Sequence, residues 1–361
     1  MRRVCSVAVF LFLTAGVVPA VAQNKPPLAL CQAMREFNPA MCLTETTLDD
    51  PLADRIPVIL IHGWNKDEIP GKPDATVWAG LRRYLDKNEE FNKYYKIYFL
   101  LYLSNVQGVR DMGLTFGDLI NQMDQADSSF RGKPLVIVGY SMGGLVARSY
   151  MQEPRLRYGS ELGGDRVLRL ITLGTPHHGT PLANGPARDH KAGALASYLF
   201  DIIDYGLFNS SLTWSTDNRF DLHWDNYDKL FDYDRDRENN LWLEWLNSGE
   251  TFDRKIVAYG GTVEPITQIK DCVFSGFRDA GCLAGIMKNN LGISQSDGVV
   301  PLNSALFFPC TECVATRTYK GYDHGEIVRG KFHFFEEPEP LFKDIASDLL
   351  TLVVPSVSKL K

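Results

Sequence analysis

The chain has 361 residues, of which 45% are hydrophobic and 23% are charged, and this is an ordinary globular composition. Its length allows one large α/β domain with insertions or two smaller domains. The formal net charge of −6 is spread along the sequence, with no basic stretch interleaved with aromatic residues, so a nucleic-acid-binding surface is excluded.

The first 22 residues have the pattern of a secretory signal peptide. A pair of arginines precedes an apolar run over residues 7–18 that is too short to span a bilayer comfortably. Ala20–Ala22 then supplies a small-residue cleavage site. We expect a mature chain that starts near Gln23, is secreted or periplasmic and has no transmembrane segment; a membrane anchor is the alternative interpretation.

Six cysteines remain once Cys5 leaves with the signal peptide, and they fall into three pairs that are local in sequence. The simplest connectivity joins the members of each pair, although other connectivities stay open. The last pair forms a C-x-x-C motif, which can also be a redox or metal site. A strand-like segment follows it and no second cysteine pair completes a zinc site, so a structural disulfide is favoured. The pairs are Cys31 with Cys42, Cys272 with Cys282, and Cys310 with Cys313.

Beyond a Pro-rich segment at residues 25–55, which is predicted to be a loop, apolar runs alternate with amphipathic segments. Continuous runs of Val, Ile and Leu separated by helices predict a parallel sheet covered on both faces, the α/β class. The predicted strands span residues 56–61, 96–103, 134–138, 167–173, 255–260 and 314–319. The predicted helices span residues 77–91, 114–130, 144–150 and 340–353.

The alternation stops between about residues 180 and 250, a segment rich in aromatic residues and Asp. Because it lies between two predicted strands, we expect an insertion over one end of the sheet. It is either a packed helical decoration or a cap whose aromatic surface shapes an apolar site, and the cap is favoured. The run Asp232–Asp236 resembles the start of a calcium loop, but Arg237 and Leu243 stand where that loop needs Gly and Glu.

The most informative motif is Gly139–Gly143, a G-x-S-x-G sequence between a predicted strand and a predicted helix. A serine in that turn is held with its hydroxyl projecting free of the backbone, and the flanking glycines let strand and helix approach closely. Ser141 is therefore the candidate nucleophile.

A serine nucleophile needs a base, and the base needs a carboxylate that orients it. In a parallel sheet with a nucleophile turn, the acid and then the histidine follow later strands. Asp297 and His324 have that order, and Glu264 is the rival acid. The other histidines are expected to be structural or to line the site: His62, His177, His178, His190, His223 and His333.

Several motifs together resemble a secreted bacterial lipase or esterase of the α/β-hydrolase superfamily. They are His62–Trp64, Gly139–Gly144, Leu173–Thr180, Ser296–Pro301 and Tyr322–His324. The resemblance covers roughly residues 56–361 apart from the cap, and it implies one α/β-hydrolase domain over residues 23–361. It also implies Ser141 as nucleophile, His324 as base, Asp297 as orienting acid and an oxyanion hole from the backbone N–H groups of Trp64 and Met142.

The expected activity is hydrolysis of carboxylic esters, with a lipase acting on acyl-glycerols or similar hydrophobic esters favoured. An acyltransferase, phospholipase, thioesterase or polyester depolymerase could use the same residues. A non-catalytic binding protein of this fold, or a redox protein using Cys310 and Cys313, are the rivals from other classes. No cofactor is expected, although a structural calcium near Glu326 stays open. The expected partners are a hydrophobic ester and, transiently, a lipid interface.

Overall fold

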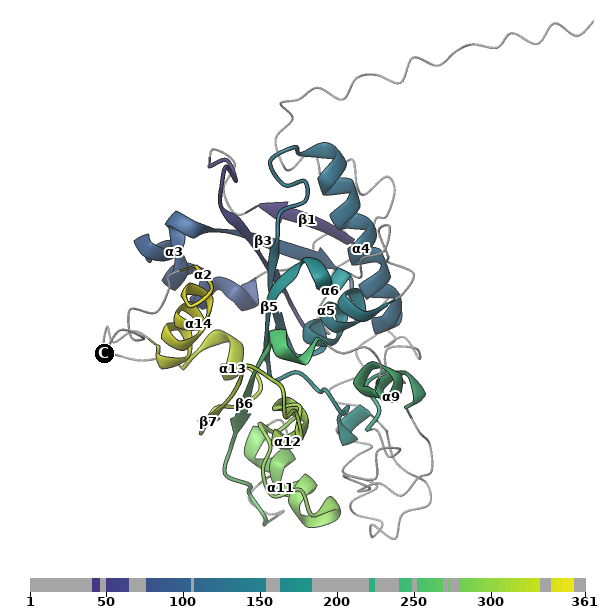
Figure 1. Cartoon of the computed structure of the whole chain (residues 1–361). Coiled ribbons are helices and arrows are strands. Elements are labelled where there is room, and N and C mark those ends of the chain that lie inside the picture. Colours follow the sequence, from purple (N-terminus) through teal and green to yellow (C-terminus); the bar gives the residue numbers. More distant parts are fainter. Residues whose placement is uncertain are drawn as a thin grey trace, which may run out of the picture.

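The structure, a computed structural model, describes most of the predicted α/β domain (Figure 1). The predicted signal peptide and most of the predicted cap lie outside this part. The described residues are 41–45, 50–64, 76–104, 107–153, 163–183, 221–224, 240–248, 252–268, 272, 279–331 and 339–353.

A seven-stranded sheet with the order β1-β3-β2-β4-β5-β6-β7 forms the centre of the described part. Six strands run parallel, and β1 alone pairs antiparallel, with β3. The predicted α/β class with a mostly parallel sheet is therefore confirmed. The strands are β1 (Met41–Glu45), β2 (Ile56–Ile61), β3 (Tyr95–Tyr102), β4 (Leu135–Tyr140), β5 (Val167–Leu173), β6 (Ile256–Thr262) and β7 (Ala315–Lys320).

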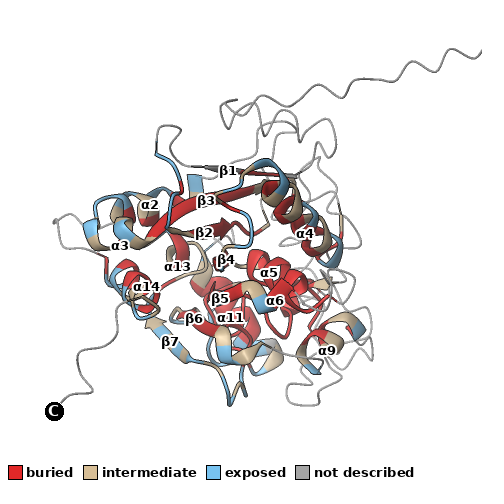
Figure 2. Cartoon of the chain, turned by 45° about the horizontal axis from the view of Figure 1, so that its top comes forward, coloured by how far each residue is buried: buried red, intermediate tan, exposed pale blue. Residues whose placement is uncertain are grey.

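Helices cover both faces of this sheet, as Figures 1 and 2 show. One apolar cluster packs beneath α2, α3 and α14, and another beneath α4 and α5. In Figure 2 the central strands and α5 are buried, whereas α2, α3 and β7 turn exposed positions outward. The longer helices are α2 (Ala79–Asp86), α3 (Glu89–Tyr94), α4 (Val109–Ala126), α5 (Met142–Gln152), α9 (Leu241–Ser248), α11 (Ala280–Leu291) and α14 (Pro340–Leu350). The short ones include α6 (Gly163–Arg166), α12 (Leu302–Ala305) and α13 (Glu326–Arg329).

Strand β1 corrects the prediction of a continuous loop over residues 25–55. Its backbone pairs with the outer edge of β3, with Met41 opposite Tyr102. Cys42 and Leu43 are buried there against the apolar cluster beneath α4. Long-range pairing with β3 thus prevails over a local sequence that has no clear strand periodicity.

None of the four predicted helices has the predicted boundaries, and two of them differ most. The helix expected over residues 77–91 divides into α2 and α3, because the Asn88 side chain accepts a hydrogen bond from the N–H of Phe91 at 3.0 Å and caps a new helix. The helix expected from residue 114 begins five residues earlier. The N–H of Val109 donates to the Asp221 carboxylate at 2.6 Å, so a distant side chain caps that end.

The cysteine-bearing segment after β6, which has no helix among those predicted, contains α11. Asp279 accepts a hydrogen bond from the N–H of Gly281 and caps this helix. The Cys272–Cys282 disulfide joins its first turn to the preceding chain. A second disulfide, Cys310–Cys313, lies between α12 and β7.

The third predicted disulfide joins Cys31 to Cys42. Cys31 lies outside the described residues, and Cys42 is buried in β1. Within the described ranges, none of the helices is both long enough and apolar enough to cross a membrane.

Candidate active site

Ser141 occupies the turn between β4 and α5 with φ of +52° and ψ of −129°. A positive φ is costly for a residue other than glycine and persists only where the surroundings hold it. Close backbone approach explains the glycines around it, since a Cβ on Gly139 would lie 2.6 Å from the Cα of Gly144. A Cβ on Gly143 would lie 2.3 Å from the carbonyl oxygen of Ile61. The motif thus builds a strained turn packed against β2.

The structure brings the three predicted catalytic side chains together at the carboxyl ends of the strands. His324 Nε2 lies 2.9 Å from Ser141 Oγ, and His324 Nδ1 lies 2.7 Å from Asp297 Oδ2. Because a carboxylate only accepts, Nδ1–H donates to Asp297, which leaves Nε2 to accept the hydroxyl hydrogen of Ser141. Glu264, the rival acid, is exposed on the segment after β6.

The carboxylate of Asp297 is buried and held by backbone N–H groups. Its Oδ1 accepts from Val299 at 2.9 Å and from Val300 at 2.7 Å. These two bonds occupy one oxygen and leave Oδ2 for His324. The side chain is fully inaccessible to solvent, so its orientation toward the imidazole is fixed by the loop itself.

The backbone around His324 is held by hydrogen bonds to three side chains. The carboxylates of Asp323 and Glu326 each accept the other residue's N–H, at 2.7 and 3.0 Å, which forms a reciprocal cap at the start of α13. The Tyr140 hydroxyl donates to the His324 carbonyl at 2.9 Å. Burial raises the pKa of Tyr140, so this donor keeps its proton. Glu326, considered above as a calcium ligand, therefore holds the histidine loop.

The two predicted oxyanion-hole residues flank the serine. A Cβ on Gly63 would lie 2.7 Å from the Cβ of Ser141, so the Gly63–Trp64 backbone lies directly beside the nucleophile turn. Met142 is the first residue of α5, where N–H groups have no carbonyl partner within the helix. His62 stacks on Tyr102 with ring centroids 4.2 Å apart, and its Nδ1 lies 2.7 Å from the Gly63 carbonyl oxygen. These contacts place His62 beside the turn as a support.

Gly174 is a site residue that the sequence analysis missed. Its φ is +57°, and a Cβ there would lie 3.2 Å from both Asp297 Oδ2 and His324 Nδ1. A side chain there would crowd the contact between acid and base, and the positive φ favours glycine as well. The signal was a glycine directly after a predicted strand in the Leu173–Thr180 motif.

Three of the remaining histidines lie in the described part of the chain. His177 and His178 are buried in the segment after β5, and His223 is buried near Thr180. His190 and His333 lie outside the described residues.

Metal ligands do not cluster in the described part of the chain, which has no group of three or more His, Cys, Asp or Glu side chains arranged to hold an ion. The calcium-like run at residues 232–236 falls outside that part.

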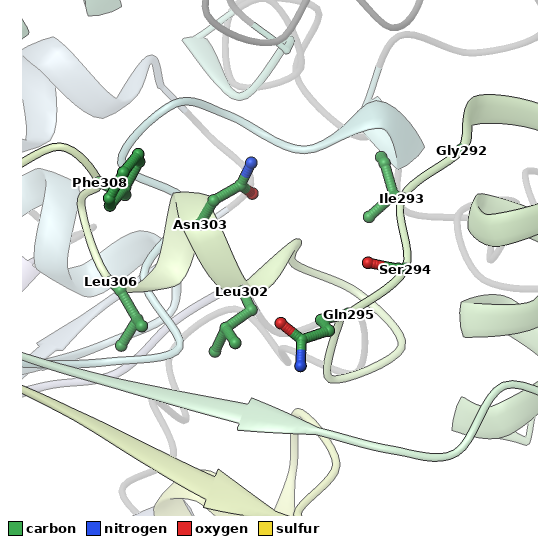
Figure 3. A pocket seen from close by; sticks show the side chains of 8 residues that line it. All are labelled: Gly292, Ile293, Ser294, Gln295, Leu302, Asn303, Leu306 and Phe308. Atoms are coloured by element: carbon green, nitrogen blue, oxygen red, sulfur yellow. The ribbon is translucent and has the colours of Figure 1, made fainter.

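A pocket of about 330 Å³ lies beside the loop Ser296–Pro301, which carries Asp297 and which we call the acid loop (Figure 3). Its walls are the segment that precedes Asp297 and the helix α12 with the residues after it. None of the three predicted catalytic residues lines it. The lining residues are Gly292, Ile293, Ser294, Gln295, Leu302, Asn303, Leu306 and Phe308.

Comparison with known proteins matches residues 83–192 to the family model of the PGAP1-like alpha/beta domain. No curated protein matches the sequence. Among solved structures, the chain is similar to a Bacillus licheniformis lipase in its mature form, at 21% identity and a TM-score of 0.46, over 85% of this chain and 97% of the lipase.

Two further structures are similar at lower identity. Staphylococcus hyicus lipase is 15% identical with a TM-score of 0.45, over 85% of this chain and 98% of that one. A Legionella pneumophila phospholipase is 17% identical with a TM-score of 0.43, over 69% of this chain and 45% of that one. These likenesses are distant, so the fold is assigned from the sheet order, the strained serine turn and the domain match.

Proposed function

We propose that this chain, which has an α/β-hydrolase fold, is a serine hydrolase that cleaves carboxylic esters. The observation that carries the proposal is the chain of contacts from Ser141 Oγ to His324 Nε2 at 2.9 Å and from His324 Nδ1 to Asp297 Oδ2 at 2.7 Å. A strained serine, an imidazole and a fully buried carboxylate in that order form the arrangement that nucleophilic acyl transfer requires.

In the proposed reaction the hydroxyl oxygen of Ser141 attacks the ester carbonyl carbon while His324 Nε2 takes its proton. The tetrahedral intermediate then collapses, and the alcohol leaves with the proton that His324 returns. Water attacks the acyl-serine with His324 again as base, which releases the acid and restores the serine. Asp297 holds the imidazole in the tautomer that can accept at Nε2 and stabilises its protonated form.

The backbone N–H groups of Trp64 and Met142 are the proposed donors to the negative oxygen of the tetrahedral intermediate. The closeness of Gly63 to Ser141 and the position of Met142 at the start of α5 support this assignment. A donor of this kind contributes roughly 3–4 kcal/mol to transition-state stabilisation.

We further propose a lipase or esterase that acts on hydrophobic esters beneath a cap formed by the insertion at residues 180–250. The part of this insertion that supports the proposal is α9, which packs its apolar side against α5 (Figure 1). Trp242 and Trp245 lie half-buried on the same apolar cluster. Such a cap would favour an acyl chain as the bound group.

Export to an oxidising compartment is part of the same proposal. The signal-like N-terminal sequence and the two disulfides, Cys272–Cys282 and Cys310–Cys313, support it, because disulfides persist in secreted and periplasmic proteins. The proposed reaction uses no cofactor.

Labelling with a fluorophosphonate tests the enzyme proposal directly. We expect the wild type to be labelled stoichiometrically and the Ser141→Ala variant not to be labelled, because the probe forms a covalent bond with an activated serine. A wild type that stays unlabelled would point to a non-catalytic protein. Undiminished ester hydrolysis after replacement of Cys310 and Cys313 would dismiss a redox role for that pair.

A panel of esters then resolves the substrate class. It runs from short p-nitrophenyl esters to emulsified triglyceride, phospholipid and polyester. We expect the highest kcat/KM for long-chain hydrophobic esters, and hydrolysis confined to short water-soluble esters would indicate an esterase instead.

A further inference from the structure

The segment 174–180, which follows β5, lies between the nucleophile turn and the acid loop; we call it the His177 segment. On one side a Cβ on Gly144 would lie 2.1 Å from the Thr175 hydroxyl oxygen, so Thr175 packs directly on α5. On the other side Gly174 adjoins Asp297 and His324, as described above. A shift of this segment would therefore move the base and the acid relative to the serine.

Hydrogen bonds tie the far end of the His177 segment to the acid loop. Thr180 Oγ1 donates to the carbonyl oxygen of Val299 at 2.5 Å, and Val299 in turn donates its N–H to Asp297. Ser304 Oγ accepts the N–H of His178 at 3.0 Å and donates to the carbonyl oxygen of Gly179 at 2.8 Å. Because Ser304 lies on α12, the His177 segment, the acid loop and α12 form one hydrogen-bonded unit.

Arg148 connects this unit to the nucleophile helix. It lies on α5, seven residues after Ser141, and only 1% of it is exposed. Its Nη1 lies 3.1 Å from His177 Nδ1 and 2.8 Å from the Asn247 side-chain oxygen, and Nη2 donates to the carbonyl oxygen of Leu246 at 2.9 Å. The guanidinium also lies over the ring of Phe307, 4.2 Å from its centroid. Arg148, His177, Asn247 and Phe307 form what we call the Arg148 junction.

The Arg148 junction holds a buried cation with neutral acceptors. No carboxylate is hydrogen-bonded to Arg148 in the described residues. Burial lowers its pKa to about 9, and the nearby charge of Asp253 opposes this shift only in part. Because a guanidinium only donates, His177 Nδ1 accepts, and the proton of the imidazole lies on Nε2, 3.1 Å from the Thr172 hydroxyl oxygen. A buried charge paired in this way is poor support for stability, which points to a role in fixing geometry.

Asn247 completes the junction from the insertion. It lies on α9 and donates through Nδ2 to the carbonyl oxygen of His177 at 2.9 Å while its Oδ1 accepts from Arg148. Gln152, one turn beyond Arg148 on α5, donates to the carbonyl oxygen of Leu246 at 2.7 Å. One guanidinium, carried by the nucleophile helix, therefore contacts the His177 segment, α9 and the chain after α12.

We propose that Arg148 is a positioning residue for the reaction, because it fixes the His177 segment, and through it Asp297 and His324, against the helix that carries Ser141. The inference rests on the proposed serine-hydrolase function. Arg148 itself touches neither Ser141 nor a substrate, so its effect falls on the turnover step rather than on substrate binding.

The test compares Arg148→Met with Arg148→Lys in p-nitrophenyl butyrate hydrolysis, with rates expressed per serine labelled at the end point by the fluorophosphonate. We expect Arg148→Met to lower kcat roughly 10- to 100-fold with KM changed less than about twofold, because small misplacements of catalytic groups cost up to about 10²-fold. Arg148→Lys should recover part of the loss, since an ammonium can reach one acceptor but cannot form the fork. The rate constant of fluorophosphonate labelling should fall with kcat.

Arg166→Met is the matched control. Arg166 is another largely buried arginine, paired with Asp124 at 2.6 and 2.8 Å and placed over the ring of Phe130, but it lies on α6 at the start of β5. We expect its removal to lower the melting temperature and to leave kcat per labelled serine unchanged.

The outcomes distinguish a failure of the proposed function from a failure of the positioning role of Arg148. A wild type without labelling would end the proposed function. A labelled wild type with an Arg148→Met variant of unchanged kcat would overturn the positioning role alone. Should Arg148→Met not fold, His177→Phe removes one acceptor and keeps the ring on Phe307; lowered kcat with unchanged KM supports the proposal, and wild-type kcat rejects it.

Discussion

Two polar clusters on opposite faces of the sheet bind an arginine in different ways: one pairs it with a carboxylate, and the other with neutral hydrogen-bond acceptors. Beneath α14, Arg317 donates to Asp348 through Nε at 2.9 Å and through Nη2 at 2.5 Å, and the Tyr259 hydroxyl donates to the same carboxylate at 2.5 Å. We call these three residues the Asp348 cluster. Its bond to Asp348 raises the pKa of Arg317, whereas burial lowers the pKa of Arg148 in the Arg148 junction.

The difference concerns what each cluster holds together. The Asp348 cluster neutralises charge with charge and joins α14 to β6 and β7, away from the serine. In the Arg148 junction the hydrogen-bond acceptors are neutral, and the junction joins α5, the His177 segment, α9 and the chain after α12 beside the predicted catalytic residues. We expect the first arrangement to matter for stability and the second for geometry at the carboxyl edge of the sheet. Substitutions on the two sides should therefore separate activity from stability.

The largest effect is expected at the catalytic edge, from Asp297→Asn. An amide cannot hold His324 in the required tautomer, so kcat/KM for p-nitrophenyl butyrate should fall by about 10⁴-fold. The free energy of unfolding should change by about 1 kcal/mol or less, because the amide oxygen can still accept from Val299 and Val300. Glu264→Gln is the control and should keep wild-type activity; the reverse pattern would assign the orienting role to Glu264.

A smaller effect, on stability and not on activity, is expected from Asp348→Ala. It leaves the Arg317 guanidinium and the Tyr259 hydroxyl without their acceptor. The loss of stability should be roughly 2 kcal/mol, reduced by the partial exposure of Arg317, with kcat unchanged. Urea unfolding and p-nitrophenyl butyrate kinetics measure the two quantities. A fall in kcat without unfolding would show that the face beneath α14 also positions the catalytic edge.

The smallest effect is a pH dependence of stability that arises at His177. Burial first, and then the positive charge of Arg148, hold the pKa of His177 well below its ordinary value of 6.5. The unfolded chain binds this proton at higher pH than the folded chain, so the contribution to stability is complete above about pH 6.5 and is lost as the pH falls toward the folded-state value.

Urea unfolding between pH 7.5 and 5.5 measures this loss. Below pH 6.5 the free energy of unfolding should fall with a slope that approaches about 1.4 kcal/mol per pH unit, the value for one proton. The His177→Phe variant should lack that component, and an identical pH dependence in the variant would assign the titration to other groups.

Motifs with a fixed local geometry were predictable from the sequence. The glycines around Ser141 specify close backbone approach in the turn itself, and the chain order of Asp297 and His324 follows from the sheet. The strand 56–61 is likewise a continuous apolar run, and it forms β2 with the predicted boundaries.

Features that depend on distant partners were not predictable. The start of α4 depends on Asp221, which lies 112 residues along the chain from Val109. β1 depends on the free edge of β3. Arg148 reads locally as a polar position on a helix, and only the arrival of His177 and Asn247, 29 and 99 residues further on, turns it into a buried junction.

The bond from the Tyr140 hydroxyl to the His324 carbonyl has a consequence for the second half of the proposed reaction. Once the serine oxygen carries an acyl group, it no longer has a hydrogen to donate to the imidazole. The residue next to the serine still holds the backbone of the histidine, and Asp297 still holds its ring. His324 would thus keep its position while the Ser141 oxygen carries the acyl group, and its Nε2 could receive a proton from an incoming water molecule.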